Sequence, residues 1–119
     1  MFMVENRIAD EAVRRNVGAG YHYFDKDTMR GFGSRVHEGY DLGHGNTLVI
    51  MSNKDRGFSL GAVVNGRRHY YLITVFGDGS TKNLEGDWKY DVCTGKGYWM
   101  TLRSARAAAK RYQAGPMEK

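Results

Sequence analysis

The sequence predicts an α+β fold, with an antiparallel sheet of about four to five strands and helices toward both ends of the chain. Three observations support this class. Apolar residues recur at helical spacing over residues 4–17 and 101–114. From residue 47 onward, short apolar and β-branched runs alternate with turn residues, which is typical of strands. The turns are short, so consecutive strands are expected to pair antiparallel as a meander.

The first predicted element is an amphipathic helix over Val4–Val17. Its apolar residues recur four positions apart, and Arg7, Asp10 and Arg14 occupy the opposite side. The glycines at positions 18 and 20 are expected to end it. A sheet needs cover on its apolar side, so we expect the apolar side of this helix to pack there.

A short helical turn is predicted after the first helix. Asp25 stands at the N-cap position of the turn, where its carboxylate can accept from backbone N–H groups of the first turn. Phe24 and Met29 have the spacing of a hydrophobic staple, and Gly33 is expected to end the turn. Phe24, Asp25 and Met29 are therefore interpreted as a structural motif.

A glycine-rich segment over residues 39–46 predicts a flexible loop, and strands are expected after it. Arg67–Phe76 has apolar residues at both odd and even positions, which predicts a central strand covered on both faces. The Asn65-Gly66 pair before it is a hairpin signal. The other expected strands are Thr47–Ser52, Phe58–Val64, Thr81–Leu84 and Trp88–Val92.

The last predicted element is a helix over Thr101–Ala114, which Gly115 and Pro116 end. Its two sides differ. The apolar side, expected to lie on the sheet, consists of Leu102, Ala105, Ala109 and Tyr112. The other side is cationic and has no acidic neighbour at helical spacing; it consists of Arg103, Arg106 and Lys110, with Arg111 beside them.

Length and composition limit the class of protein. With 119 residues, of which 41% are hydrophobic, the chain is expected to form a single globular domain over residues 1–119. No apolar run approaches the roughly 18–20 residues of a membrane span, and the N-terminal charges do not fit a signal peptide. A single cysteine, Cys93, fits a reducing compartment. Neither it nor the histidines have metal-site spacing, so no metal or cofactor is expected.

Positive charge is concentrated at the C-terminal end. The formal net charge is +5, and residues 91–119 carry six basic against two acidic side chains, an excess of four. A localised excess indicates an anionic partner, and phosphates would relieve the repulsion among the basic residues of the last helix. The sequence therefore predicts DNA or RNA binding through that helix. A solvated, solubilising helix side is the other interpretation. The residues concerned are Arg103, Arg106, Lys110 and Arg111.

The alternative function is a protein-binding inhibitor or modulator of a host factor. Aromatic and arginine side chains are frequent anchors of protein interfaces, which makes Arg30, Tyr98 and Trp99 candidates. Packing in the core is the commoner use of such aromatic residues. No residues follow the pattern of a catalytic, phosphate-loop or dinucleotide site, so the chain is expected to bind and not to act as an enzyme.

The segment Tyr21–Val36, Y-H-Y-F-D-K-D-T-M-R-G-F-G-S-R-V, resembles a motif of small proteins encoded by bacteriophages of actinobacteria. Gly31 replaces a bulky aromatic residue of that motif. The resemblance implies a small phage accessory protein in the host cytoplasm, and it implies no particular activity. The positions that match are Phe24, Asp25, Asp27, Thr28, Met29, Arg30, Phe32, Ser34 and Arg35, and further along Asp78-Gly79 and Ala105, Ala108 and Ala109.

Overall fold

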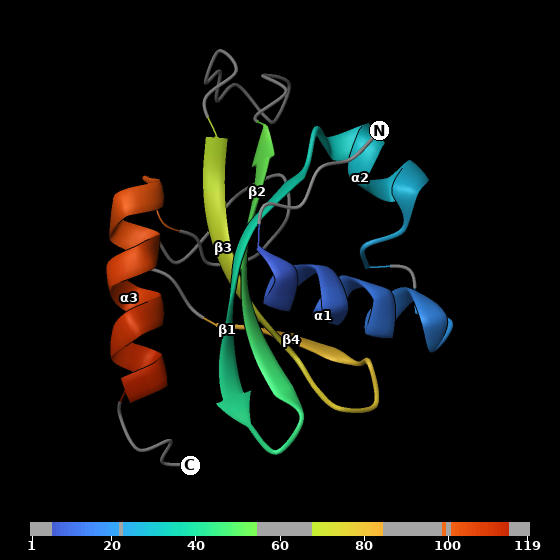
Figure 1. The fold of residues 1–119 in the computed structure, drawn as a ribbon. Coiled ribbons are helices and arrows are strands. Elements are labelled where there is room, and N and C mark those ends of the chain that lie inside the picture. Colours follow the sequence, from blue (N-terminus) through green and yellow to red (C-terminus); the bar gives the residue numbers. More distant parts are fainter. Residues whose placement is uncertain (1–5, 22, 55–67, 85–98, 100, 115–119) are drawn as a thin grey trace.

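The structure, a computed structural model, describes residues 6–21, 23–54, 68–84, 99 and 101–114 (Figure 1). Helices and an antiparallel sheet confirm the α+β class. In chain order the elements are α1 (Arg7–Gly18), α2 (Lys26–Phe32), β1 (Arg35–Gly43), β2 (Asn46–Lys54), β3 (Arg68–Val75), β4 (Thr81–Asn83) and α3 (Leu102–Ala114).

The sheet is a meander with the strand order β1-β2-β3-β4, and each neighbouring pair is antiparallel. β2 and β3 form the central pair, with Thr47 opposite Val75. β4 is short and pairs with the last residues of β3. At the other end of β3, Trp99 and Tyr70 exchange two backbone hydrogen bonds of 2.7 and 2.9 Å. The positions of β2, β3 and β4 confirm three of the predicted strands.

The segment predicted to be a flexible loop is instead strand β1 and its turn into β2. It pairs with β2 over most of its length, with Tyr40 opposite Leu48. The loop prediction is wrong because these glycines form the tight turn of a hairpin and a close contact within a strand. Gly43 and Gly45 adopt positive φ angles of 86° and 79° and form the tight turn. Gly39 lies within the strand, directly against α1.

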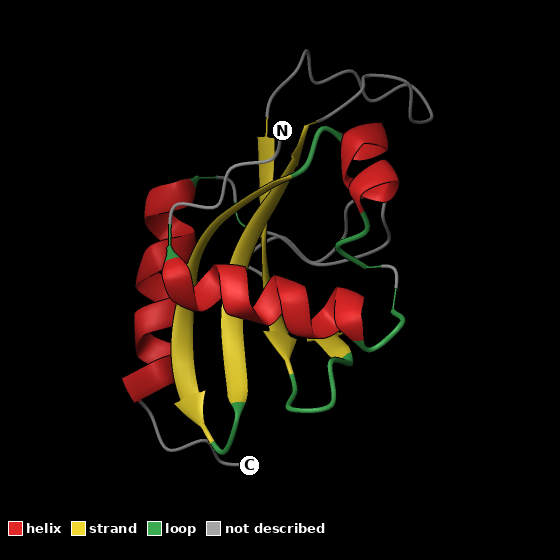
Figure 2. Cartoon of the chain, turned by 45° about the vertical axis from the view of Figure 1, so that its right-hand side comes forward, coloured by secondary structure: helices red, strands yellow, loops and turns green. Residues whose placement is uncertain are grey.

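The helices cover opposite faces of the sheet: α1 lies across the strands on one face and α3 lies on the other (Figure 1, Figure 2). β3 contributes to the core on both faces, which confirms the predicted central strand. The core under α1 and α2 contains Ala9, Ala12, Val13, Phe24, Met29, Val36, Val49, Met51, Tyr71, Ile73 and Val75. The core under α3 contains Leu48, Ile50, Leu72, Trp99, Ala105, Ala108 and Ala109.

Helix α1 begins later than its apolar spacing suggests, because Asn6 caps it. The Asn6 side chain accepts a hydrogen bond of 3.0 Å from the Ile8 backbone N–H. The buried side of the helix is narrower than predicted and consists of small residues and one amide, Asn16. Ile8 and Val17 lie at its two margins and are 40% and 45% exposed. Small residues are favoured here because the helix packs closely on Gly39.

Helix α2 confirms part of the predicted motif and corrects another part. Phe24 and Met29 are both buried in the core under α1, as the staple requires. Gly33 ends the helix with a left-handed backbone, φ 60° and ψ 37°. Asp25 occupies the N-cap position, but its side chain makes no capping hydrogen bond. The first turn is exposed at Lys26, so water can satisfy its free N–H groups instead.

Helix α3 matches its predicted range. Thr101 accepts a hydrogen bond of 3.0 Å from the Ser104 N–H at its start, which is a cap of the expected type. Ala105 and Ala109 are fully buried against the sheet, as predicted, whereas Tyr112 is 36% exposed. The expected strands Phe58–Val64 and Trp88–Val92, the Asn65-Gly66 turn and Cys93 lie outside the described residues.

Candidate functional site

The exposed side of α3 carries three cations without a counter-charge. Arg103, Lys110 and Arg111 are exposed and form no hydrogen bond or ion pair with any residue that the structure describes. Arg103 and Lys110 are seven positions apart, which places them on one side of the helix about two turns from each other. Their guanidinium and ammonium groups are therefore available to an external anion.

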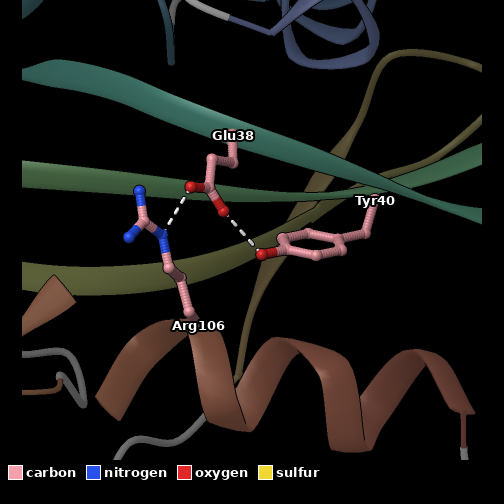
Figure 3. A network of polar contacts seen from close by, with 3 residues as sticks. All are labelled: Glu38, Tyr40 and Arg106. Atoms are coloured by element: carbon pink, nitrogen blue, oxygen red, sulfur yellow. Dashed lines mark hydrogen bonds and ion pairs between the residues drawn. The ribbon is translucent and has the colours of Figure 1, made fainter. Parts of the chain in front are cut away.

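Arg106, predicted to act together with these three residues, is exposed but paired with a carboxylate of the protein itself. Its Nε donates to Glu38 Oε2 of β1 at 2.5 Å (Figure 3). No acidic residue stands at helical spacing from Arg106, because its carboxylate partner comes from a strand 68 positions earlier. Arg106 thus fastens α3 to β1.

The other oxygen of Glu38 is also occupied, since Tyr40 donates its hydroxyl proton to Glu38 Oε1 at 2.6 Å (Figure 3). Burial, the hydrogen bond to Glu38 and the negative charge of Glu38 together raise the pKa of Tyr40 to about 12, against an opposing effect of the Arg106 charge. A further link comes from Gln113, whose side chain donates to the Asp41 carbonyl at 2.9 Å. The Glu38-x-Tyr40 spacing puts both side chains on one face of a strand, a signal that becomes readable only once β1 is recognised.

The Tyr40 hydroxyl is expected to lose its proton at a higher pH than an ordinary tyrosine. The tyrosinate absorbance of the native protein minus that of Tyr40→Phe should have its midpoint near pH 12, whereas an ordinary phenol titrates near 10. Because the folded-state pKa is raised, this group contributes stability below about pH 10 that is lost as the pH rises toward 12. Glu38→Gln should move the midpoint downward. A difference midpoint at 10 in the native protein would contradict the network.

The residues predicted as protein-interaction anchors are dispersed. Arg30 is exposed on α2, with an ion pair of 3.5 Å to Asp27 between two solvated side chains. Trp99 is 5% exposed and belongs to the core under α3, so its assignment as a surface anchor is wrong. It is buried because its backbone extends the edge of β3 beside Tyr70. Tyr98 lies outside the described residues.

A groove of about 580 Å³ lies between α2 and the end of α1. Pockets of about 300–1,000 Å³ are typical of small-molecule sites. Its lining combines three apolar side chains with two cations, which would suit an acidic group attached to an apolar one. The described residues that line it are Val17, Phe24, Lys26, Met29, Arg30, Gly33 and Ser34.

Within the described part of the chain, no three His, Cys, Asp or Glu side chains gather in a way that could hold a metal ion. None of the helices described is long and apolar enough to cross a bilayer. Comparison of the chain with protein-family models, with curated proteins and with solved structures gives no match.

Proposed function

We propose that the chain binds nucleic acid through Arg103, Lys110 and Arg111 on the exposed side of α3. One observation carries the proposal: these three cations are exposed and have no counter-charge among the described residues. Arg106 is not part of the proposed contact, because Glu38 already neutralises it. The proposed role is binding without catalysis.

The arrangement of the cations favours a polyanion over a single small ion. Arg103 and Lys110 are roughly 10 Å apart along the helix axis, at 1.5 Å per residue. A DNA duplex presents one phosphate charge for about every 1.7 Å of its axis, so several phosphates fall within that span. The helix is also fixed to the sheet by Arg106 and Gln113, so its basic side is presented without prior ordering.

Binding is expected to be largely independent of sequence. Phosphate contacts position a protein on nucleic acid but carry no base information. A role as a phage accessory protein in a host cytoplasm is proposed on the resemblance of residues 21–36 alone. A host protein that docks at the α2 groove, near Arg30, is the competing proposal.

Replacing Arg103, Lys110 and Arg111 together by Gln should weaken binding of labelled duplex and single-stranded oligonucleotides. With three phosphate contacts, the plot of log affinity against log salt for duplex DNA should have a slope of about −2 to −3, which should approach zero in the variant. The fold should persist, since all three side chains are exposed. Fluorescence anisotropy at low and physiological salt measures both quantities.

The matched control removes the same charge elsewhere. Arg7, Arg14 and Lys82 are exposed on α1 and β4, so their replacement by Gln lowers the net charge equally without touching α3. If the control weakens binding as much as the α3 variant, the contact is a general charge effect and the proposed site is wrong. If the native protein does not bind at low salt, the α2 groove and a protein partner become the better candidate.

A further inference from the structure

A second group of cations lies at the end of the sheet where β3 begins. Arg68, the first residue of β3, donates from Nη1 to the Gly33 carbonyl and to Ser52 Oγ, both at 2.9 Å. Ser52 is fully buried and also shares a hydrogen bond of 2.8 Å with His37 Nε2. The guanidinium is thus held between β2 and the segment that follows α2. The Gly33 carbonyl and the buried Ser52 hydroxyl fix its orientation.

This partly buried guanidinium has no carboxylate partner among the described residues. Arg35 of β1 lies directly opposite Ser52, the residue whose hydroxyl accepts from Arg68, so a second cation stands beside this guanidinium. Burial lowers the pKa of Arg68 and the positive charge of Arg35 lowers it further, whereas Tyr70 acts in the opposite direction. Arg35 is exposed and forms no ion pair with any residue described. The two like charges repel each other, and the Arg68 guanidinium is partly removed from water, which is unfavourable unless an anion joins them.

The remaining donors of Arg68 are arranged for such an anion. The two protons of Nη1 are donated to the Gly33 carbonyl and to Ser52. The Nε and Nη2 protons have no acceptor among the described residues. That edge of a guanidinium matches two oxygens of a carboxylate or a phosphate group. A carboxylate would neutralise only one of the two arginines. A terminal phosphate, with a charge of about −1.5 to −2 at neutral pH, would neutralise both.

We propose that Arg68 and Arg35 form a binding site for a phosphate group with two ionisable oxygens, either free phosphate or the terminal phosphate of a larger ligand. Arg68 donates hydrogen bonds from Nε and Nη2 to two oxygens of the phosphate, and Arg35 supplies the second positive charge. The site uses none of the α3 residues, so it can exist whether or not α3 binds nucleic acid. It is distinct from a backbone phosphodiester contact, since a diester carries a single charge.

The test is a titration with inorganic phosphate at constant ionic strength, followed by the arginine Nε–H signals in ¹H–¹⁵N spectra. Phosphate should shift the Arg68 and Arg35 signals saturably, and Arg68→Gln and Arg35→Gln should each lower the affinity about tenfold or more. Arg35→Gln leaves the hydrogen bonds of Arg68 to Gly33 and Ser52 in place, so this variant alone can decide the test if Arg68→Gln does not fold. Arg7→Gln, which removes an exposed arginine on α1, is the matched control and should have no effect.

Two further arms identify the source of the phosphate. The variant with Arg103, Lys110 and Arg111 replaced by Gln is titrated with one oligonucleotide carrying either a 5′-phosphate or a 5′-hydroxyl. Tighter binding of the phosphorylated form, lost in Arg35→Gln, supports a terminal phosphate on a larger ligand. Equal binding of the two forms, with saturable inorganic phosphate, supports a free phosphate ligand. Shifts that never saturate, or that persist in both arginine variants, would overturn the site.

Discussion

Gly39→Ala is expected to lower the free energy of unfolding by about 3 kcal/mol or more, at the upper end of overpacking effects. A Cβ atom at this position would lie 2.5 Å from the Ala9 backbone nitrogen and 2.7 Å from the Ala9 Cα. Both atoms belong to the helix backbone, so no side-chain rotation can relieve the clash. Helix α1 would have to move away from β1, which loosens the packing of Ala9 and Ala12 in the core. Urea denaturation measures the loss.

Gly18→Ala is the matched control for this change. Gly18 is the last residue of α1, and a Cβ there would meet nothing within 4 Å. Since alanine favours helix over glycine by up to about 1 kcal/mol, this variant should be neutral or slightly more stable. If Gly39→Ala proves as well tolerated as Gly18→Ala, α1 does not pack on β1 as closely as described.

Asn16→Asp is expected to destabilise the protein by about 3 kcal/mol or more at pH 7. Asn16 is fully buried; its Nδ2 donates to the Gly79 carbonyl at 2.7 Å, and its Oδ1 accepts from the Phe24 N–H at 3.3 Å. A carboxylate has the same shape but cannot donate, so the Gly79 carbonyl would lose its partner and face a buried negative charge. The bond between α1 and the β3–β4 turn would be lost.

The pH dependence of this variant separates charge from shape. Burial would raise the folded-state pKa of the new carboxyl above its unfolded value of about 3.9. The penalty is therefore full at neutral pH and shrinks as the pH falls through the folded-state pKa, so the gap to the native protein should be smaller at pH 5 than at pH 7. Asn6→Asp, the same change at the exposed cap of α1, should stay within about 0.5 kcal/mol, because Asp and Asn cap equally well. A pH-independent gap would mean that the effect is not electrostatic.

Sequence periodicity predicts well those elements that are held in place by apolar packing on the core. β3 is apolar at odd and even positions because helices cover both of its faces, and α3 alternates small apolar and basic residues because one side lies on the sheet. In both cases the burial of each residue follows from its own position in a repeat. Those patterns are local, so a single sequence contains them.

The features that the sequence did not predict depend on residues far apart in the chain. Gly39 reads as a loop residue until α1 is placed against it, and Arg106 reads as a free cation until Glu38 is placed beneath it. From the sequence, Trp99 could be an interface anchor or, as is commoner for such residues, part of the core; its pairing with Tyr70 places it in the core. No local pattern marks Arg68, because its role depends on Gly33 and Ser52, which are distant in sequence. No local pattern specifies such contacts.

The placement of α3 has a consequence for the order of events during synthesis. Leu48, Ile50 and Leu72 leave the ribosome well before the helix that covers them. Until α3 emerges, one face of the sheet presents a contiguous apolar surface, the kind of surface through which nascent chains associate with each other or with chaperones. The ion pair between Arg106 and Glu38 can form only after α3 has emerged, so its formation marks the docking of α3 on the sheet.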